Sequence, residues 1–280
     1  MAITKDLVDP GDQMIADDVH DWAREKHNFL GRYIKITAAT RRKFLGPGKA
    51  GATFSDLFCA TGRSYIEESA RWIDGSAQMA WRESVLCGAP FSQVHIADLR
   101  DEARKVCASR LRTTKAPVHE VPGSAIEASY KLISVLDPFA YHLIFLDPYG
   151  LRELDFKIIE SLSKLKRVDL IVHLSTMDLQ RNLLSNISST DSVFDSFSPG
   201  WRAKVDVSGN QTKIRSQIIG HWKDKVKDLG IWPSENMKLI TGHEGQRLYW
   251  LLIAAKHPLA QKLWNASTDL SGQRNLFSNS

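Results

Sequence analysis

An aspartate-proline-tyrosine-glycine turn follows a long apolar stretch in "YHLIFLDPYG" (141–150), and it carries the strongest chemical signal of the sequence. An aryl amine is a poor nucleophile because its lone pair is delocalised into the ring. The Asp147 carboxylate and a backbone carbonyl beside Pro148 can hold the N–H groups of such an amine and direct the lone pair at an electrophile. Tyr149 can stack on a base. The alternative is a plain Pro-Gly turn after a buried strand.

A second turn, in "FSDLFCATG" (54–62), ends the first β-branched and aromatic run of the chain. Asp56 ends this run, and its carboxylate can orient the turn or accept from an ammonium group. Ala60 and Gly62 lack bulk, so the backbone can approach a ligand closely. The turn therefore predicts a nucleotide-type cofactor site, with a tight strand-to-helix bend as the alternative. No G-x-G-x-x-G is present, which counts against NAD or FAD.

Two further residues follow apolar runs at positions where a cofactor would lie. Asp98 ends "VHIAD", and a carboxylate there can accept from both hydroxyls of a ribose. It can instead cap the helix expected after it. Ser124, in "VPGSA" (121–125), can place a donor at an adenine edge or simply cap the next helix. Both pairs of alternatives stay open at this point.

The elements that must position these turns alternate between short apolar runs and amphipathic stretches. Such alternation predicts right-handed βαβ crossovers and a parallel sheet with helices on both faces. The last two runs are separated only by "TGHEGQ", which predicts an antiparallel hairpin. The expected strands are 53–58, 93–98, 117–121, 141–147, 168–174, 237–240 and 247–256, and the expected helices are 20–44, 76–87, 100–112, 124–136 and 153–166.

Five parallel strands followed by one antiparallel hairpin are typical of class I S-adenosylmethionine (SAM) methyltransferases. We therefore predict an α/β fold: a Rossmann-like sheet of seven strands, the last antiparallel, with helices on both faces. A single domain is expected over residues 20–265, with a flexible leader at 1–19 and a polar tail at 266–280. The excursion 63–75, directly after the first turn, is expected to act as a lid. The Ser/Asp-rich stretch 185–200 is expected to be a long loop.

Composition limits the remaining function classes. The 280 residues carry a net charge of +5, which suits a polyanionic partner such as DNA or RNA. The longest apolar stretch (248–255) is too short to span a bilayer, so no membrane association is expected. Three separated cysteines fit a reducing cytoplasm and predict neither disulfides nor a zinc site. The histidines form no H-E-x-x-H set, and no G-x-S-x-G or G-K-[ST] motif occurs, which excludes the common hydrolase and NTPase motifs.

The order of "FSDLFCATG", "VHIAD", "IFLDPYG", "DLIVHLSTMDLQR" and "RLYWLLIAAKHPLAQKLW" resembles the three-Cys-motif partner (TcmP) proteins. These are Rossmann-type proteins encoded beside a radical-SAM-like protein that bears three cysteines. The resemblance runs from about Trp22 to Trp264, and the closing segment is its most specific part. Ala60 departs from the family's glycine-rich first turn. Together, "ATG" and "DPYG" are also similar to tRNA guanine-N2 methyltransferases.

The resemblance implies a SAM-dependent methyltransferase that acts on an exocyclic amine of a nucleobase in DNA or RNA. It also implies the residues that line the two halves of the site. The SAM pocket would be lined by Asp56, Phe58, Ala60, Gly62, Asp98 and Ser124, and the substrate side by Asp147, Pro148, Tyr149 and Arg181. Arg181 would clamp a phosphate, or form a surface pair with Asp178. The alternative function is a non-catalytic or regulatory module that acts with a three-Cys radical-SAM-like partner.

Overall fold

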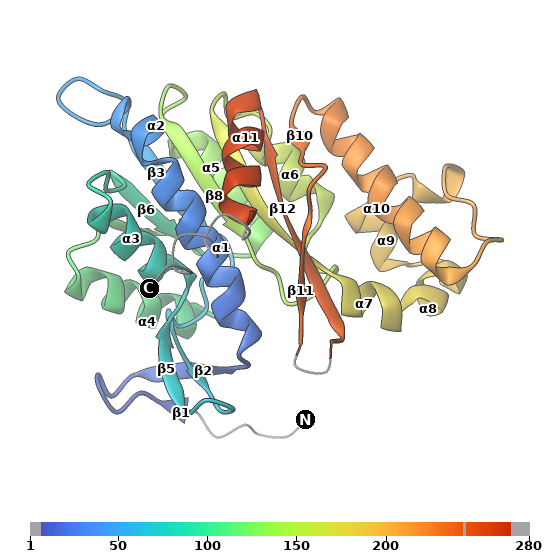
Figure 1. Ribbon diagram of the computed structural model, residues 1–280, viewed down its shortest axis with the longest axis horizontal. Helices are drawn as coiled ribbons and strands as arrows, with labels where there is room; N and C mark the ends of the chain where they lie inside the picture. The colour runs from blue at the N-terminus through green and yellow to red at the C-terminus, as the bar shows by residue number, and fades with distance from the viewer. Residues whose placement is uncertain (1–6, 243–244, 270–280) are drawn as a thin grey trace, which may run out of the picture.

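The computed structural model describes residues 7–242 and 245–269. A mixed sheet runs through the middle of the molecule in the order β10-β12-β9-β8-β3-β6-β7, with β11 paired to β12 (Figure 1). Its strands are β3 (Ala52–Asp56), β6 (Gln93–Ile96), β7 (Val118–Glu120), β8 (Tyr141–Leu146), β9 (Val168–Ser175), β10 (Trp232–Pro233), β11 (Lys238–Thr241) and β12 (Arg247–Ala255).

The strand directions establish the fold class. The five strands β7, β6, β3, β8 and β9 are parallel, whereas β12 runs antiparallel to β9 and lies between β9 and β11. This is the sheet of class I methyltransferases, so the predicted fold class is confirmed. The short strand β10 was not expected, and it adds an eighth member beside β12.

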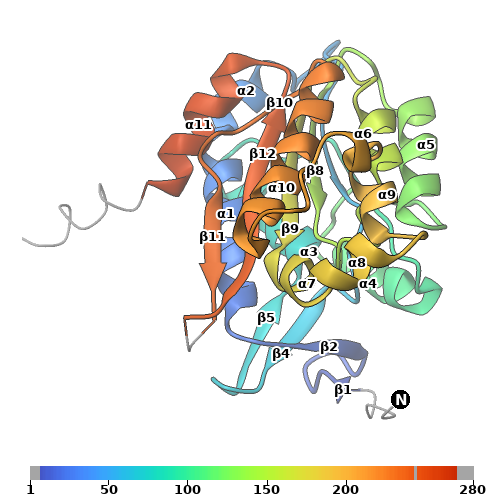
Figure 2. The ribbon, with the colours of Figure 1, turned by 90° about the vertical axis from the view of Figure 1, so that its right-hand side faces the viewer.

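Helices cover both faces of the sheet (Figures 1 and 2). One apolar core lies under α1, α3, α4 and α11, and the other lies under α5, α6, α9 and α10. On the first face are α1 (Trp22–Ile36), α2 (Ala38–Arg42), α3 (Ser76–Leu86), α4 (Asp101–Thr113) and α11 (Pro258–Thr268). The other face carries α5 (Ala125–Val135), α6 (Phe156–Leu162), α7 (Thr176–Arg181), α8 (Leu183–Ser188), α9 (Val193–Phe197), the 3₁₀ turn η1 (Trp201–Ala203) and α10 (Gln211–Asp228).

Three segments differ from the sequence-based expectation. The stretch 185–200 is not a plain loop, since it holds the end of α8 and all of α9, and Ser192 and Asp195 form a capping box at the start of α9. The expected helix 20–44 is divided at Thr37 into α1 and α2. The expected tail begins inside α11, and its residues 270–280 lie outside the described part.

A second, smaller sheet lies at the carboxyl edge of the central sheet (Figures 1 and 2). Its order is β1-β2-β4-β5, and β2 pairs in parallel with β4. The excursion 63–75 thus forms the antiparallel hairpin β4–β5. The described residues of the leader form the other two strands of the small sheet. The four strands are β1 (Leu7–Val8), β2 (Ile15–Val19), β4 (Arg63–Ile66) and β5 (Arg71–Asp74).

One buried arginine fastens the leader to the first turn. Arg110 of α4 is only 4% exposed, and its guanidinium donates to both carboxylate oxygens of Asp12, at 2.7 and 2.9 Å. It also donates to the backbone carbonyls of Met14, Ile15 and Thr61. Because one guanidinium satisfies acceptors from both segments, the leader is held on the turn between β3 and β4.

Among the described residues, no helix is both long and apolar enough to cross a lipid bilayer.

Replacement of this arginine tests how strongly the leader is attached. We expect Arg110→Ala to lower the free energy of unfolding by about 3–5 kcal/mol, because it leaves a partly buried carboxylate and several carbonyls without their donor. The matched control is Arg112→Ala, which removes an exposed arginine paired with Glu120 and should cost under about 1 kcal/mol. Urea denaturation measures both values. Equal losses in the two variants would contradict the clamp.

Candidate active site at the carboxyl edge of the sheet

Three aspartates predicted from the sequence lie at the carboxyl ends of neighbouring parallel strands. Asp56 ends β3, Asp98 follows β6, and Asp147 follows β8; β3 lies between the other two strands. Burial is the main cause that raises the pKa of Asp56, and the nearby carboxylates of Asp147 and Asp98 add to it. The fold therefore brings together carboxylates that are far apart in the sequence, at the edge where open α/β sheets bind ligands.

The first turn uses backbone conformations that favour glycine. Ala60 has φ +49° and Gly62 has φ +76°. A Cβ on Gly62 would lie 2.9 Å from the Cys107 sulfur, so α4 packs directly on this turn. An L-residue is strained at such a φ because of its Cβ, so Ala60 is strained where a glycine would not be.

The amide groups of this turn already donate to protein acceptors. Two of the acceptors are the side chains of Asp98 and Asp17, and the others are backbone carbonyls or the buried Asp56. The pairs are Leu57 N to Phe145 O (3.3 Å), Phe58 N to Asp56 Oδ1 (3.1 Å), Cys59 N to Ala97 O (2.9 Å), Ala60 N to Asp98 Oδ2 (2.9 Å) and Thr61 N to Asp17 Oδ2 (2.9 Å). A ligand that accepts from the Ala60 or Thr61 amide must therefore displace Asp98 or Asp17.

Asp56 is completely buried beneath the turn. Burial raises its pKa to about 7, although hydrogen bonds from the Ser76 hydroxyl and the Phe58 amide work in the opposite direction. Both oxygens thus serve the structure of the turn. Asp56 orients the first turn and the start of α3, which is one of the two roles predicted for it.

The structure tests only the helix-cap alternative for Asp98 and Ser124, and the ribose contact of Asp98 stays a prediction. Asp98 is not the cap of α4, whose preceding residue is Arg100. Its two oxygens instead accept from the Ala60 and Arg100 amides, at 2.9 and 2.8 Å. Ser124 does cap its helix, because it forms a capping box with Glu127 at the start of α5. Its contact with an adenine stays a prediction.

Asp147 lies in a buried charge cluster that the sequence did not reveal. Its side chain is 12% exposed, and its oxygens pair with the Lys26 ammonium of α1 and, at 2.6 Å, with Nδ1 of His173 on β9. Burial alone would raise the pKa of Asp147, but Lys26 and His173 outweigh it and hold the pKa well below its ordinary value. Asp147 is therefore a carboxylate at neutral pH, and each oxygen keeps a second lone pair for another donor.

In the rest of the DPYG turn, only Tyr149 faces outward. Pro148 is buried, whereas Tyr149 is 98% exposed. The turn is fixed by Asp178 of α7, whose carboxylate accepts from the Leu151 amide at 2.7 Å. Within the described residues Asp178 bonds to Leu151 and Asn182 rather than to Arg181, which is exposed at the end of α7.

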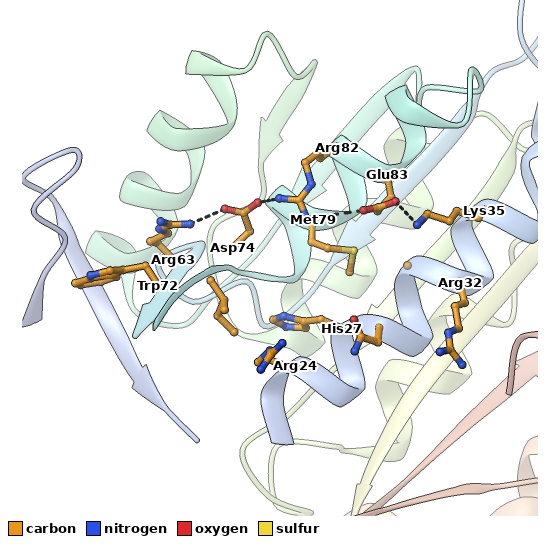
Figure 3. A pocket seen from close by; sticks show the side chains of 13 residues that line it. Arg24, His27, Arg32, Lys35, Arg63, Trp72, Asp74, Met79, Arg82 and Glu83 are labelled. Carbon is orange, nitrogen blue, oxygen red and sulfur yellow. Dashed lines mark hydrogen bonds and ion pairs between the residues drawn. The ribbon is translucent and has the colours of Figure 1, made fainter. Parts of the chain in front are cut away.

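A separate cavity of about 500 Å³ lies between α1, β5 and α3. Figure 3 shows its charged side chains joined in a row of ion pairs, through Arg63, Asp74, Arg82, Glu83 and Lys35. The cations of this row are thus compensated by carboxylates of the protein. The cavity is lined by the hairpin predicted as a lid, including Trp72, but not by the three strand-end aspartates.

In the described part of the chain, no group of three or more His, Cys, Asp or Glu side chains is placed to hold a metal ion.

Comparisons with known proteins add solved structures of low similarity. No family model matches the chain, and no curated protein sequence matches it. An O-methyltransferase from Bacillus cereus in complex with SAH is similar, with 11% identity, coverage of 85% of this chain and 84% of that one, and a TM-score of 0.48. So is TrmK of M. capricolum, also with SAH, at 8% identity, 79% and 67% coverage and a TM-score of 0.36. The fold class rests on the strand order of the sheet.

Asp56 should make stability depend on pH. Its pKa is raised to about 7 from 3.8, so its contribution is complete below the lower value and is lost as the pH rises through about 7. We expect Asp56→Asn, which cannot ionise, to be more stable than wild type at pH 8 by on the order of 2 kcal/mol, with the gap closing toward pH 4. The exposed Asp101→Asn is the control. Chemical denaturation between pH 5 and 8 measures both; a gap that stays constant would refute the assignment.

The backbone conformation of Ala60 gives a second prediction. Because Ala60 has φ +49°, we expect Ala60→Gly to raise the free energy of unfolding by about 1 kcal/mol. The same change inside α4, Ala103→Gly, should lower it by a similar amount, since glycine disfavours helix. Thermal denaturation compares the two variants. A loss of stability in both would show that position 60 is not strained.

Proposed function

We propose that the chain is a SAM-dependent methyltransferase that acts on an exocyclic amine of a nucleobase in DNA or RNA. The observation that carries this proposal is the meeting of Asp56, Asp98 and Asp147 at the ends of β3, β6 and β8, in a sheet with the class I strand order. Ligands bind at this edge of open α/β sheets. When bound, SAM would supply an electrophilic methyl group.

The first turn and its neighbours would hold the cofactor. Asp98 would accept from the ribose hydroxyls after exchanging its bond with the Ala60 amide. Ala60 and Gly62 keep the turn open to close approach, and Asp56 would fix the conformation of the turn from below. The Ala60 and Thr61 amides already donate to Asp98 and Asp17. These two side chains must therefore move before a ligand can accept from the same amides.

The DPYG turn would hold the substrate. The ionised Asp147 retains lone pairs that can accept an amine N–H, beside the buried Pro148. The exposed ring of Tyr149 offers a stacking surface for a base, and such stacking is worth about 1–3 kcal/mol. Arg181 is exposed on the neighbouring helix α7, where it would contact a phosphate. The net charge of +5 favours a nucleic acid.

The second candidate is a non-catalytic or regulatory module that acts with a three-Cys radical-SAM-like protein. The observation that favours it is the first turn, whose amides at residues 57–61 are all engaged within the protein. On this alternative the exposed Tyr149 would contact the partner protein.

Binding and transfer assays separate the two candidates. Titration calorimetry with SAM should give measurable binding, which Asp98→Ala weakens about 10-fold or more while the exposed Asp101→Ala does not. Tyr149→Ala should raise KM for nucleic acid by roughly 10-fold, because it removes a stacking surface. Its matched control is Phe139→Ala, an exposed aromatic that precedes the opposite end of β8.

The contrary outcome is also specific. Absence of SAM binding in wild type, together with co-purification of a three-Cys partner that survives Asp147→Asn, would favour the second candidate. Transfer of labelled methyl groups to DNA or RNA that is lost in Asp147→Asn would reject it.

A further inference from the structure

One ring nitrogen of His173 has no hydrogen-bond partner in the part of the chain that the structure describes. Nδ1 lies 2.6 Å from Asp147 Oδ1, and the ring packs edge-on against Tyr249 with centroids 3.9 Å apart. Nε2 is buried and has no hydrogen-bond partner among the described residues. Buried polar atoms are almost always paired, because an unpaired one loses its hydration without compensation. Among the six buried side-chain atoms without a hydrogen-bond partner in the described residues, Nε2 of His173 is the one that belongs to an imidazole, and that ring is bonded to Asp147.

A second buried histidine, on the neighbouring strand β8, provides the comparison. Nδ1 of His142 lies 2.9 Å from the Thr53 hydroxyl, and its Nε2 lies 3.0 Å from the Asp137 carbonyl. The fold thus satisfies both nitrogens of an imidazole that has no proposed chemistry. Of these two buried histidines, only His173, which lies beside Asp147 at the carboxyl edge, has an unpaired ring nitrogen among the described residues.

The surroundings of His173 decide which nitrogen carries the proton. The Asp147 carboxylate faces it from β8, the Lys26 ammonium from α1 and the Tyr249 phenol from β12. Burial lowers the pKa of His173, against the opposing effect of Asp147, so the ring is neutral at neutral pH. Since Asp147 can only accept, the ring proton lies on Nδ1 and the lone pair on Nε2. A carboxylate-held imidazole of this kind is the usual form of a general base.

We propose that Nε2 of His173 accepts the proton that the substrate amine loses on methylation. This inference rests on the proposed function. The amine lone pair forms the new N–C bond, while the S–C bond of the sulfonium donor breaks and its electron pair stays on sulfur. The methylated ammonium then gives one N–H proton to Nε2. The resulting imidazolium is stabilised by Asp147, which also positions the ring through Nδ1.

Two variants separate a proton acceptor from a structural residue. His173→Asn keeps an N–H donor near the Nδ1 position but has no basic nitrogen. His142→Asn makes the same change in the fully paired histidine. We expect His173→Asn to lower kcat by roughly 10²–10⁴-fold with the Kd for SAM within about threefold, and to abolish the fall of kcat at acidic pH. His142→Asn should retain that acid limb.

A spectroscopic measurement tests the proton position without activity. In long-range ¹H–¹⁵N spectra of the ligand-free protein, the signals lost in His173→Asn should belong to a neutral ring protonated on Nδ1 at pH 7. Asp147→Asn should shift that tautomer toward Nε2–H. An Nε2–H tautomer in wild type overturns the inference; where His173→Asn fails to fold, the signals that shift in Asp147→Asn identify the ring.

The inference and the proposed function fail in different ways. A wild-type protein that binds no SAM refutes the proposed function. A wild type that transfers methyl groups, with a folded His173→Asn variant whose kcat lies within about threefold of it, refutes only the role of His173.

Discussion

A carboxylate removed from water must find compensating charge and donors inside the protein, and Asp147 imposes this constraint on the whole carboxyl edge. Lys26 and His173 provide the compensation, so α1, β8 and β9 meet at one point. Tyr249 of β12 closes the cluster, since it packs on His173 and its hydroxyl donates to the Trp22 carbonyl at the start of α1. The N-terminal helix and the last strand of the sheet are therefore positioned by the same buried charge.

The three strand-end aspartates occupy very different electrostatic states although they lie close together. Asp147 is held ionised by its cationic partner, whereas Asp56, buried without one, has a pKa of about 7. The Asp98 side chain is 13% exposed, and it accepts a hydrogen bond from the Ala60 amide of the first turn. One edge of the sheet thus combines a permanent charge, a buried acid that titrates near neutrality and a carboxylate that can exchange partners. Residues of one type can serve different roles in a site only when their environments give them different charge states or different partners.

The sequence indicated the sheet well because its central strands are buried on both faces and read as continuous apolar runs. Strand-end aspartates could be placed from the same runs. The excursion 63–75 gives no clear strand signal, because its short strands are half-buried and gain their order from β2, and its role as a lid stays a prediction. Lys26 gave no local signal, since it meets Asp147 only across 121 positions of sequence. His173 does give a sequence signal, since it is a polar residue inside the apolar run "VDLIVHL". Its partner Asp147 can be identified only from the fold.

The contact between Trp22 and Tyr249 spans 227 positions, and this has a consequence for how the chain is made. During synthesis α1 leaves the ribosome long before β12, the strand that contacts it through Tyr249. Until β12 joins β9, the apolar stripe of α1 and the Lys26 ammonium lack part of their native surroundings. An apolar surface that stays exposed during synthesis can misassemble or bind chaperones. The packing of α1 is thus completed only after β12 has been translated, so folding of this region cannot finish before then.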